Sequence, residues 1–306
     1  MLRYIIHRVV LAIPLLLLVV TAVFVVFALI PGDPALIYAG ESAHPEVIER
    51  VRRQFGLDRP LHVRYLTYLR ELSQGNMGRS IFTGVPVATE LRQKFTNTLH
   101  LAVASIALAA AVGIGTGILS ALKKNAGWDR VTTLFALGGI SIPGFWLALL
   151  LIYFFSVQLR WFPTGGVGTW RHYVLPTVAL SVFSTAYLTR MTRSALLEVV
   201  RNDYIRTARA KGLPERLVIF KHALRNALIP VVTVMGLRLG ITLTGSVVTE
   251  TIFAWPGLGR LMVAAVNGRD YPVIQGTLLF FAATFVVVNL LVDVSYAVFD
   301  PRIRYR

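Results

Sequence analysis

The sequence predicts an all-α integral membrane protein with six transmembrane helices. Hydrophobic residues make up 55% of its 306 residues and charged residues 15%, whereas soluble domains carry about 25% charged residues. The apolar residues come in long blocks, and about 20 apolar residues cross a bilayer as a helix. A membrane β-barrel would instead show short segments of alternating polarity. Six blocks qualify as spans, at residues 9–30, 99–122, 131–159, 173–189, 227–249 and 273–292.

The blocks differ in how regular they are. Block 131–159 is long enough to tilt or kink at Pro143 and Gly144, and block 173–189 is the shortest. Only Arg238 interrupts block 227–249. The first block is longer than the roughly 7–15 apolar residues of a cleavable signal, so we expect a retained anchor.

The positive charge is distributed as an orientation signal. The net charge is +16, and Lys and Arg gather at both chain ends and in the connections after the second and fourth spans. By the positive-inside rule, these connections and both termini lie in the cytoplasm. This pattern argues against nucleic-acid binding. The chain has no cysteine, so disulfides and thiolate metal sites are excluded.

Three regions follow from this layout. Residues 1–30 are the cytoplasmic N-terminus and the first span, and residues 98–306 are a five-helix core with a cytoplasmic loop at 190–226. Between them, 31–97 is an extracytoplasmic segment with two expected helices. The first, 45–55, carries an apolar stripe of Val47, Val51 and Phe55, and the second begins at Leu61. The segment is too short for a robust core of its own, so we expect it to pack on the membrane part as a cap.

The basic loop contains a short helix with signals at both ends. Asp203 is a candidate N-cap, and Gly212 suits the left-handed position after the helix. Arg209 and Lys211 lie in its last turn, where cations complement the helix dipole. Pro214 opens a second helix, so the two helices meet at a corner.

Leu217, Phe220 and Leu224 are expected to give the second helix an apolar face. One interpretation of the whole loop is a solvated basic segment that only sets topology. The other is a docking element for a cytoplasmic partner. Caps at both ends of so short a helix favour docking.

Residues 206–212 (RTARAKG), followed by 222–230 (HALRNALIP), resemble the conserved cytoplasmic loop of ABC importer permeases. The closest likeness is to the peptide-type permeases that serve dipeptides, oligopeptides, glutathione and nickel. In the general signature Glu stands where this chain has Arg206, a difference that the peptide-type branch shares. Further stretches that agree are 31–34 (PGDP), 76–80 (NMGRS), 250–259 (ETIFAWPGLG) and 270–275 (DYPVIQ).

The resemblance implies the type I ABC importer permease fold and a permease subunit for small peptides in the bacterial inner membrane. The implied partners are a homologous second permease, two cytoplasmic ABC ATPases, an extracytoplasmic substrate-binding protein and membrane lipid. The ATPases would bind ATP and Mg, since this chain has no phosphate-binding loop. We therefore expect no enzyme activity, cofactor or metal here. The implied ATPase-coupling residues are Asp203, Tyr204, Arg206, Thr207, Ala208, Arg209, Lys211, Gly212, Pro214 and Glu215.

Two charged residues in the fifth span are candidates for the substrate pathway, because intramembrane charge is costly and often functional. Arg238 can meet a substrate carboxylate, pair with Asp293 or snorkel to water. Glu250 can meet an amino group, close the outer mouth or contact the binding protein. Asp293 is expected to pair with Arg190, Arg193 or Arg302.

Other functions stay open at this point. The same architecture serves nickel or metal chelates. His100 and Asn97 lie at the start of the second span, but a lone His there is expected to be a packed interface residue and not a nickel ligand. An ion-coupled secondary transporter would need carboxylates near mid-membrane and often shows internal repeats. A membrane enzyme or a scaffold is the remaining alternative.

Overall fold

The computed structural model describes residues 2–30, 33–39, 43–54 and 56–299. The described part of the chain is helical, apart from turns and one isolated bridge between Arg79 and Pro86, which confirms the all-α prediction. Two helices, η1 and η2, are π-helical. The elements are α1 Leu2–Leu29, α2 Pro34–Ala39, α3 Pro45–Gln54, α4 Leu61–Ser73, α5 Val87–Leu122, α6 Gly127–Ser141, α7 Gly144–Leu151, η1 Ile152–Gln158, α8 Trp170–Val199, α9 Asp203–Ala210, α10 Glu215–Leu217, η2 Val218–Ala223, α11 Leu224–Gly245, α12 Val247–Ile252, α13 Leu258–Gly268 and α14 Tyr271–Phe299.

Fewer helices qualify as spans than the predicted six. In the described residues, four are long and apolar enough: Ile6–Leu29, Val87–Leu122, Glu215–Thr244 and Tyr271–Val294. A fifth span is possible if α6 and the α7–η1 helix count together, although they are bent by 103°. The bend falls at Pro143, as expected, because proline disfavours helical backbone at the residue before it. Helix α8, which contains the shortest predicted span, does not meet the same test.

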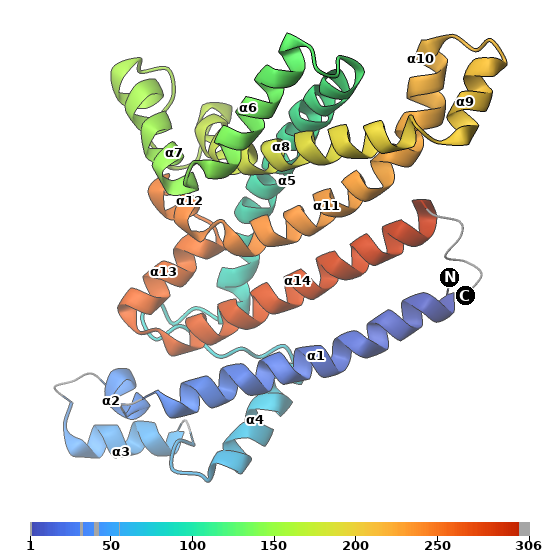
Figure 1. Ribbon diagram of the computed structural model, residues 1–306. Helices are drawn as coiled ribbons and strands as arrows, with labels where there is room; N and C mark the ends of the chain where they lie inside the picture. The colour runs from blue at the N-terminus through green and yellow to red at the C-terminus, as the bar shows by residue number, and fades with distance from the viewer. Residues whose placement is uncertain (1, 31–32, 40–42, 55, 300–306) are drawn as a thin grey trace.

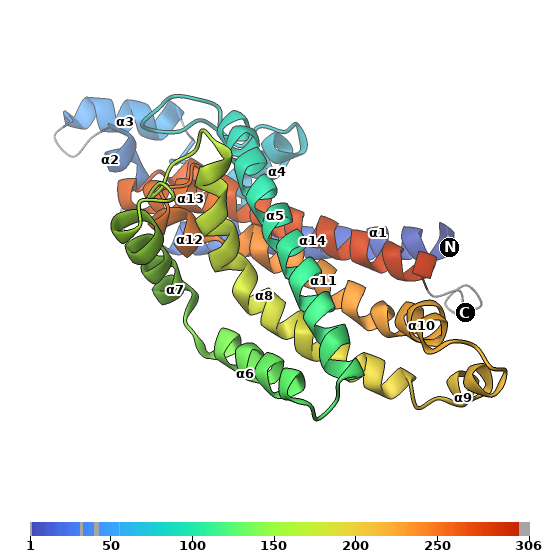
Figure 2. The same cartoon turned by 90° about the horizontal axis from the view of Figure 1, so that it is seen from above.

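The long helices pack side by side, and the shorter helices lie at the two ends of the molecule. Helix α5 packs most extensively on α8, α11 lies between α8 and α14, and α1 runs along α14 (Figure 1). The start of α1, the end of α14 and helices α9 and α10 lie at one end of the molecule. Helices α2, α3, α12 and α13 lie at the opposite end (Figure 2).

Small residues set the helix spacing. A Cβ added at Gly117 would lie 2.7 Å from the Thr192 Cβ, and one at Gly113 would lie 2.9 Å from the Leu188 Cβ. Helices α5 and α8 therefore approach as closely as glycine allows. Gly236 makes the same kind of contact with Val292 of α14. These glycines therefore serve packing within the chain.

The segment between α1 and α5 contains the expected helices and packs as expected on the rest of the protein. The hydroxyls of Tyr65 and Thr21 are 2.6 Å apart, and the Phe24 ring packs on Tyr65 and Tyr68. No α3 side chain is buried and Val47 is exposed, so the apolar stripe does not enter a core. Phe55 and residues 31–32 of the PGDP motif lie outside the described residues.

Candidate coupling corner and charged sites

Helix α9 forms as the sequence predicts, but its cap is different. The N-cap residue is Asn202, with no side-chain capping bond, and Asp203 is the first helical residue. The predicted Asp203 cap is therefore wrong by one position. Its carboxylate still lies in the first turn, where it favours the helix dipole, and it accepts a long 3.5 Å contact from Arg206 Nη1.

The corner after α9 has the predicted backbone geometry. Gly212 has φ +76°, a left-handed conformation in which a Cβ is strained. Pro214 is the N-cap of α10 with φ −62°, the value that its ring imposes. The chain therefore turns between α9 and α10 through two residues whose backbone preferences fit the turn.

One face of α9 is fixed to the helix bundle. Ile205 is completely buried and Ala208 nearly so. Both belong to an apolar cluster that joins the ends of four other helices. Its remaining buried members are Ala121 of α5, Ala195 and Leu196 of α8, Val218 and Ala223 of η2, and Ala227 of α11.

The opposite face of the corner is open to solvent. Tyr204 is 42% exposed and Phe220 54% exposed. Leu217 is also exposed, so the predicted apolar face that includes Leu217 and Phe220 is turned largely to solvent. Val218, Ile219 and Ala223 are buried instead, because the π-helical turn changes which side chains share a face. The corner thus presents aromatic and basic side chains on one side and a packed core on the other.

Two polar contacts brace the corner internally. Arg209 donates to Glu215 with both Nη2 (2.7 Å) and Nε (3.1 Å), a bidentate pair that spans the Gly212 turn. These hydrogen bonds from Arg209 lower the pKa of Glu215 below its ordinary value. Asn226 Nδ2 donates to the Tyr204 hydroxyl at 2.7 Å. Arg209 and Glu215 therefore hold the corner rigid, a role that the sequence did not indicate.

A second ion pair, also missed from the sequence, lies where α5, α6 and α8 meet. Asp129 is 4% exposed and accepts from Arg193 Nε at 2.7 Å and Nη2 at 2.9 Å. Its carboxylate also accepts from the Ser120 hydroxyl and, at 2.9 Å, from the Asn125 backbone. The predicted pairing of Arg193 with Asp293 is wrong. The α5–α6 turn and the C-terminal part of α8 are fastened together ten positions before α9 begins.

The two charged groups of the spans have other partners than expected. Asp293 pairs with Arg8 of α1, Nη1 to Oδ2 3.1 Å, and not with Arg190 or Arg193; Arg302 lies outside the described residues. Arg238 lies 4.6 Å from the ring centroids of both Phe183 and Tyr187, and cation–π contacts of this kind stabilise a desolvated guanidinium. The suggested Arg238–Asp293 pair is absent among the described contacts.

Glu250 is fully buried and fully partnered. Its Oε1 accepts from the hydroxyls of Thr98 (2.7 Å) and Ser246 (2.8 Å). Its Oε2 accepts from the backbone N–H groups of Gly259 (2.7 Å) and Arg260 (3.2 Å). The predicted pathway contact does not fit this geometry, because the carboxylate has no exposed surface to offer a solute.

Residues 250–259 fold around the Glu250 carboxylate, and we call this connection the α12–α13 clamp. A Cβ at Gly257 would lie 2.4 Å from Glu250 Oε2. Trp255 Nε1 donates to the Asn97 carbonyl at 3.1 Å, and Asn97 Nδ2 donates to the Pro256 carbonyl at 3.0 Å. The α12–α13 connection is thereby tied to α5. The packed role expected for His100 is wrong, because His100 is exposed, whereas Asn97 is partly buried.

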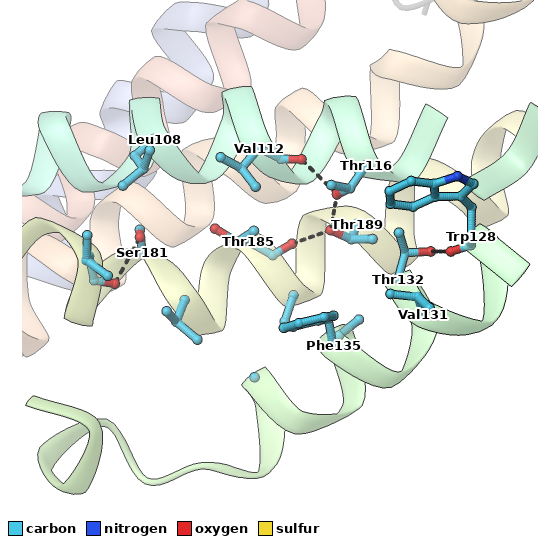
Figure 3. A pocket seen from close by; sticks show the side chains of 15 residues that line it. Leu108, Val112, Thr116, Trp128, Val131, Thr132, Phe135, Ser181, Thr185 and Thr189 are labelled. Atoms are coloured by element: carbon cyan, nitrogen blue, oxygen red, sulfur yellow. Dashed lines mark hydrogen bonds between the residues drawn. The ribbon is translucent and has the colours of Figure 1, made fainter. Parts of the chain in front are cut away.

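A groove of about 470 Å³ lies between α5, α6 and α8 (Figure 3). Four hydroxyls that line it, those of Thr116, Thr132, Ser181 and Thr189, donate to backbone carbonyls of their own helices. The groove therefore suits apolar groups rather than a polar solute. Nowhere in the described residues do three or more His, Asp or Glu gather as a metal site would require.

Comparison with known proteins defines the class. The family model "Binding-protein-dependent transport system inner membrane component" matches residues 113–305, and the corresponding N-terminal model matches residues 1–102. The chain belongs to this family, the permease subunits of binding-protein-dependent ABC importers.

Related proteins and solved structures agree with this family assignment. The chain is 47% identical to the glutathione transport system permease protein GsiC of Escherichia coli strain K12, over 100% of both chains. It is 48% identical to the GsiC protein of Pectobacterium atrosepticum, again over both full lengths. An inward-facing MetNI methionine ABC transporter matches with a TM-score of 0.60 and 21% identity, covering 69% of this chain and 96% of that one. The last similarity concerns the fold alone.

Proposed function

We propose that this chain imports small peptides, with glutathione as the first candidate, as one half of a membrane channel. The observation that carries the proposal is full-length identity of 47% to glutathione permeases, combined with an exposed and internally braced corner at 203–215. The homologous second permease, two ATPases and an extracytoplasmic binding protein complete the proposed assembly.

The corner is proposed to be the site where the ATPases bind this chain. Its exposed face carries Tyr204, Arg206 and Phe220, and aromatic and arginine side chains are common anchors at protein interfaces. Its buried face is continuous with the ends of α5, α8 and α11. A displacement of α9 by a closing ATPase pair then moves the bundle, since a packed core transmits strain. In this proposal α9 is a rigid element whose position is set by the state of the ATPase pair.

The proposed orientation places the corner and both termini in the cytoplasm. The corner, the start of α1 and the end of α14 share one end of the molecule (Figure 2), which fits the positive-inside pattern of the sequence. Segment 33–97 then faces the outside and meets the binding protein. We further propose six crossings, with α8 and the bent α6–η1 pair completing the span set inside the full assembly.

Arg238 is the residue that we propose for the solute path. It is partly exposed on α11 and it is held by two aromatic rings instead of a carboxylate. Its charge is therefore not neutralised by these contacts. A solute carboxylate can approach such a guanidinium without displacing an internal ion pair.

The test is transport by the purified assembly in proteoliposomes. We expect glutathione uptake to require ATP on the corner side and the binding protein on the other side, and to survive collapse of ion gradients by ionophores. Gradient-driven uptake without ATP would contradict the proposal. So would an assembly in which the exposed face of α9 contacts no ATPase in any nucleotide state.

A further inference from the structure

A large polar cavity lies between segment 33–97 and the start of α14, away from α11 and its Arg238. Its volume is about 890 Å³, within the range of about 300–1,000 Å³ that holds small organic ligands. Phe24, Leu57, Met77, Ile81 and Pro272 supply apolar walls.

The charge lining this cavity is strongly positive. Arg53, Arg59, Arg64 and Arg79 line it, against the single carboxylate of Glu71. Within the described chain, no carboxylate forms an ion pair with any of these arginines. Arg79 donates instead to the Gly84 carbonyl at 3.1 Å.

Arg52, the sequence neighbour of Arg53, differs from the cavity arginines in having acidic partners. Arg52, which does not line the cavity, is paired with both Asp33 and Glu49. Asp33 and Glu49 therefore neutralise Arg52, and no ion pair among the described residues involves Arg53. Like charges held together without counter-ions repel one another, and an anion between them relieves the repulsion.

Tyr68 lines the same cavity, but its hydroxyl is buried behind the wall and lacks a partner. The Tyr68 oxygen is inaccessible to solvent and forms no hydrogen bond among the described residues, although unpaired buried polar groups are rare and costly. Burial raises the pKa of Tyr68 to about 12, so the hydroxyl keeps its proton and remains a donor. Gln54, Thr67, Asn76 and Gln275 add further polar groups to the lining.

We propose that this cavity binds a small organic oxyanion, with a short carboxylate-bearing peptide as the class that fits best. The guanidinium groups donate to the carboxylates, and the apolar walls cover the carbon skeleton. An inorganic anion would use the donors and leave these walls unused. The cavity is an anion-binding site beside the helix bundle, separate from the proposed solute path at Arg238.

The experiment measures binding of radiolabelled glutathione, which has two carboxylates, to the full assembly in nanodiscs of zwitterionic lipid, without the binding protein. We expect saturable binding, and about tenfold or weaker binding of glutathione diethyl ester, in which both carboxylates are masked. Arg53→Gln and Arg64→Gln each weaken binding by about tenfold. Arg70→Gln on α4 is the matched control, because Arg70 does not line the cavity.

Two further variants separate the site from folding and from the solute path. Tyr68→Phe removes an unpaired hydroxyl that a ligand in the cavity cannot reach, so we expect an unchanged or raised apparent Tm and unchanged glutathione binding. Arg238→Gln should leave this binding unchanged even if it abolishes uptake. The readout needs no transport, so a failure of the proposed import function leaves this test intact.

Several results would overturn the inference. These are equal affinities for glutathione and its diester, equal affinities of Arg64→Gln and Arg70→Gln, or equally tight binding of inorganic phosphate in the same competition assay. A lipid headgroup is the other source of an oxyanion. Phosphatidylglycerol retained by the assembly in native mass spectrometry, lost in Arg64→Gln, with no saturable glutathione binding, would assign the cavity to lipid and reject a soluble ligand.

Discussion

Asp129 at the start of α6 holds Arg193 near the end of α8 through two hydrogen bonds of 2.7 and 2.9 Å. The pair fastens the α5–α6 turn to the helix that leads directly into the corner. Removing one partner of a largely buried ion pair strands the other charge. We expect Asp129→Asn to destabilise the chain by about 2 kcal/mol, less than for a fully buried pair because Arg193 is partly exposed.

The measurement for Asp129→Asn is the apparent Tm of the purified assembly. Asp203→Asn is the control, since the Asp203 side chain is 96% exposed and its loss should leave the Tm unchanged. The double variant Asp129→Asn with Arg193→Gln should lose less than the sum of the single losses. Additive losses would show that the pair does not act as a unit.

Gly212→Ala should weaken coupling without disturbing packing. A Cβ at Gly212 meets no atom within 4 Å, so the cost comes only from the left-handed backbone, about 1 kcal/mol. We expect reduced ATP-driven uptake while ATPase subunits still assemble. The readout is uptake per ATP hydrolysed.

Gly212→Asn provides the internal comparison, because Asn tolerates the left-handed conformation better than Ala. It should retain more coupling than Gly212→Ala. Gly138→Ala, at a helical position with open space and no positive φ, should behave like the parent protein. Full ATP-coupled uptake by Gly212→Ala would argue against the corner as the coupling element.

Glu250→Gln should destabilise the α12–α13 clamp. Each Glu250 oxygen accepts two donors, and an amide nitrogen in place of Oε2 would face the N–H groups of Gly259 and Arg260. The expected loss is about 2–3 kcal/mol, from buried donors left unsatisfied. The assay is the apparent Tm and the yield of folded protein.

Glu198→Gln on exposed Glu198 serves as the control and should have no effect. If Glu250→Gln kept the parent Tm and lost uptake of amine-bearing solutes alone, the solute-contact interpretation of Glu250 would return.

The Arg209–Glu215 pair gives the corner a defined pH dependence. The folded-state pKa of Glu215 lies below its ordinary value of 4.5. The stabilisation is therefore fully present above about pH 4.5 and is lost as the pH falls through the folded-state pKa. The pair is exposed, so we expect a local loosening of the corner and not global unfolding.

The absence of cysteine makes this measurable with a spin label on Lys211→Cys alone. Its mobility should rise as the pH drops below about 4.5. In Glu215→Gln the label should be mobile already at pH 7 and show little change on acidification. A label equally immobile in both proteins at pH 7 would mean that the pair does not brace the corner.

Arg238→Gln should reduce glutathione uptake more than it reduces stability. Its charge meets no carboxylate among the described contacts, and its aromatic contacts contribute about 1 kcal/mol, so we expect a small Tm change. Arg238→Lys retains the charge and should retain part of the uptake. Unchanged uptake in the charge-reversal variant Arg238→Glu would remove Arg238 from the path.

Local patterns in the sequence were sufficient for the helices and for the corner. Long apolar blocks predict spanning helices because a bilayer core satisfies no backbone hydrogen bond. Gly212 and Pro214 predict the turn because their backbone preferences are intrinsic. The break at Pro143 follows from the same local rule, although its 103° bend does not.

Only the tertiary structure determined the partner of each charged side chain. Asp129 and Arg193 are 64 positions apart, and Glu250 and Thr98 are 152 apart. Helical periodicity places each side chain on a face of its own helix, but the partner depends on how helices cross and how closely their glycines let them approach. For the same reason the sequence offered several partners for Asp293, and packing of α1 against α14 selected Arg8.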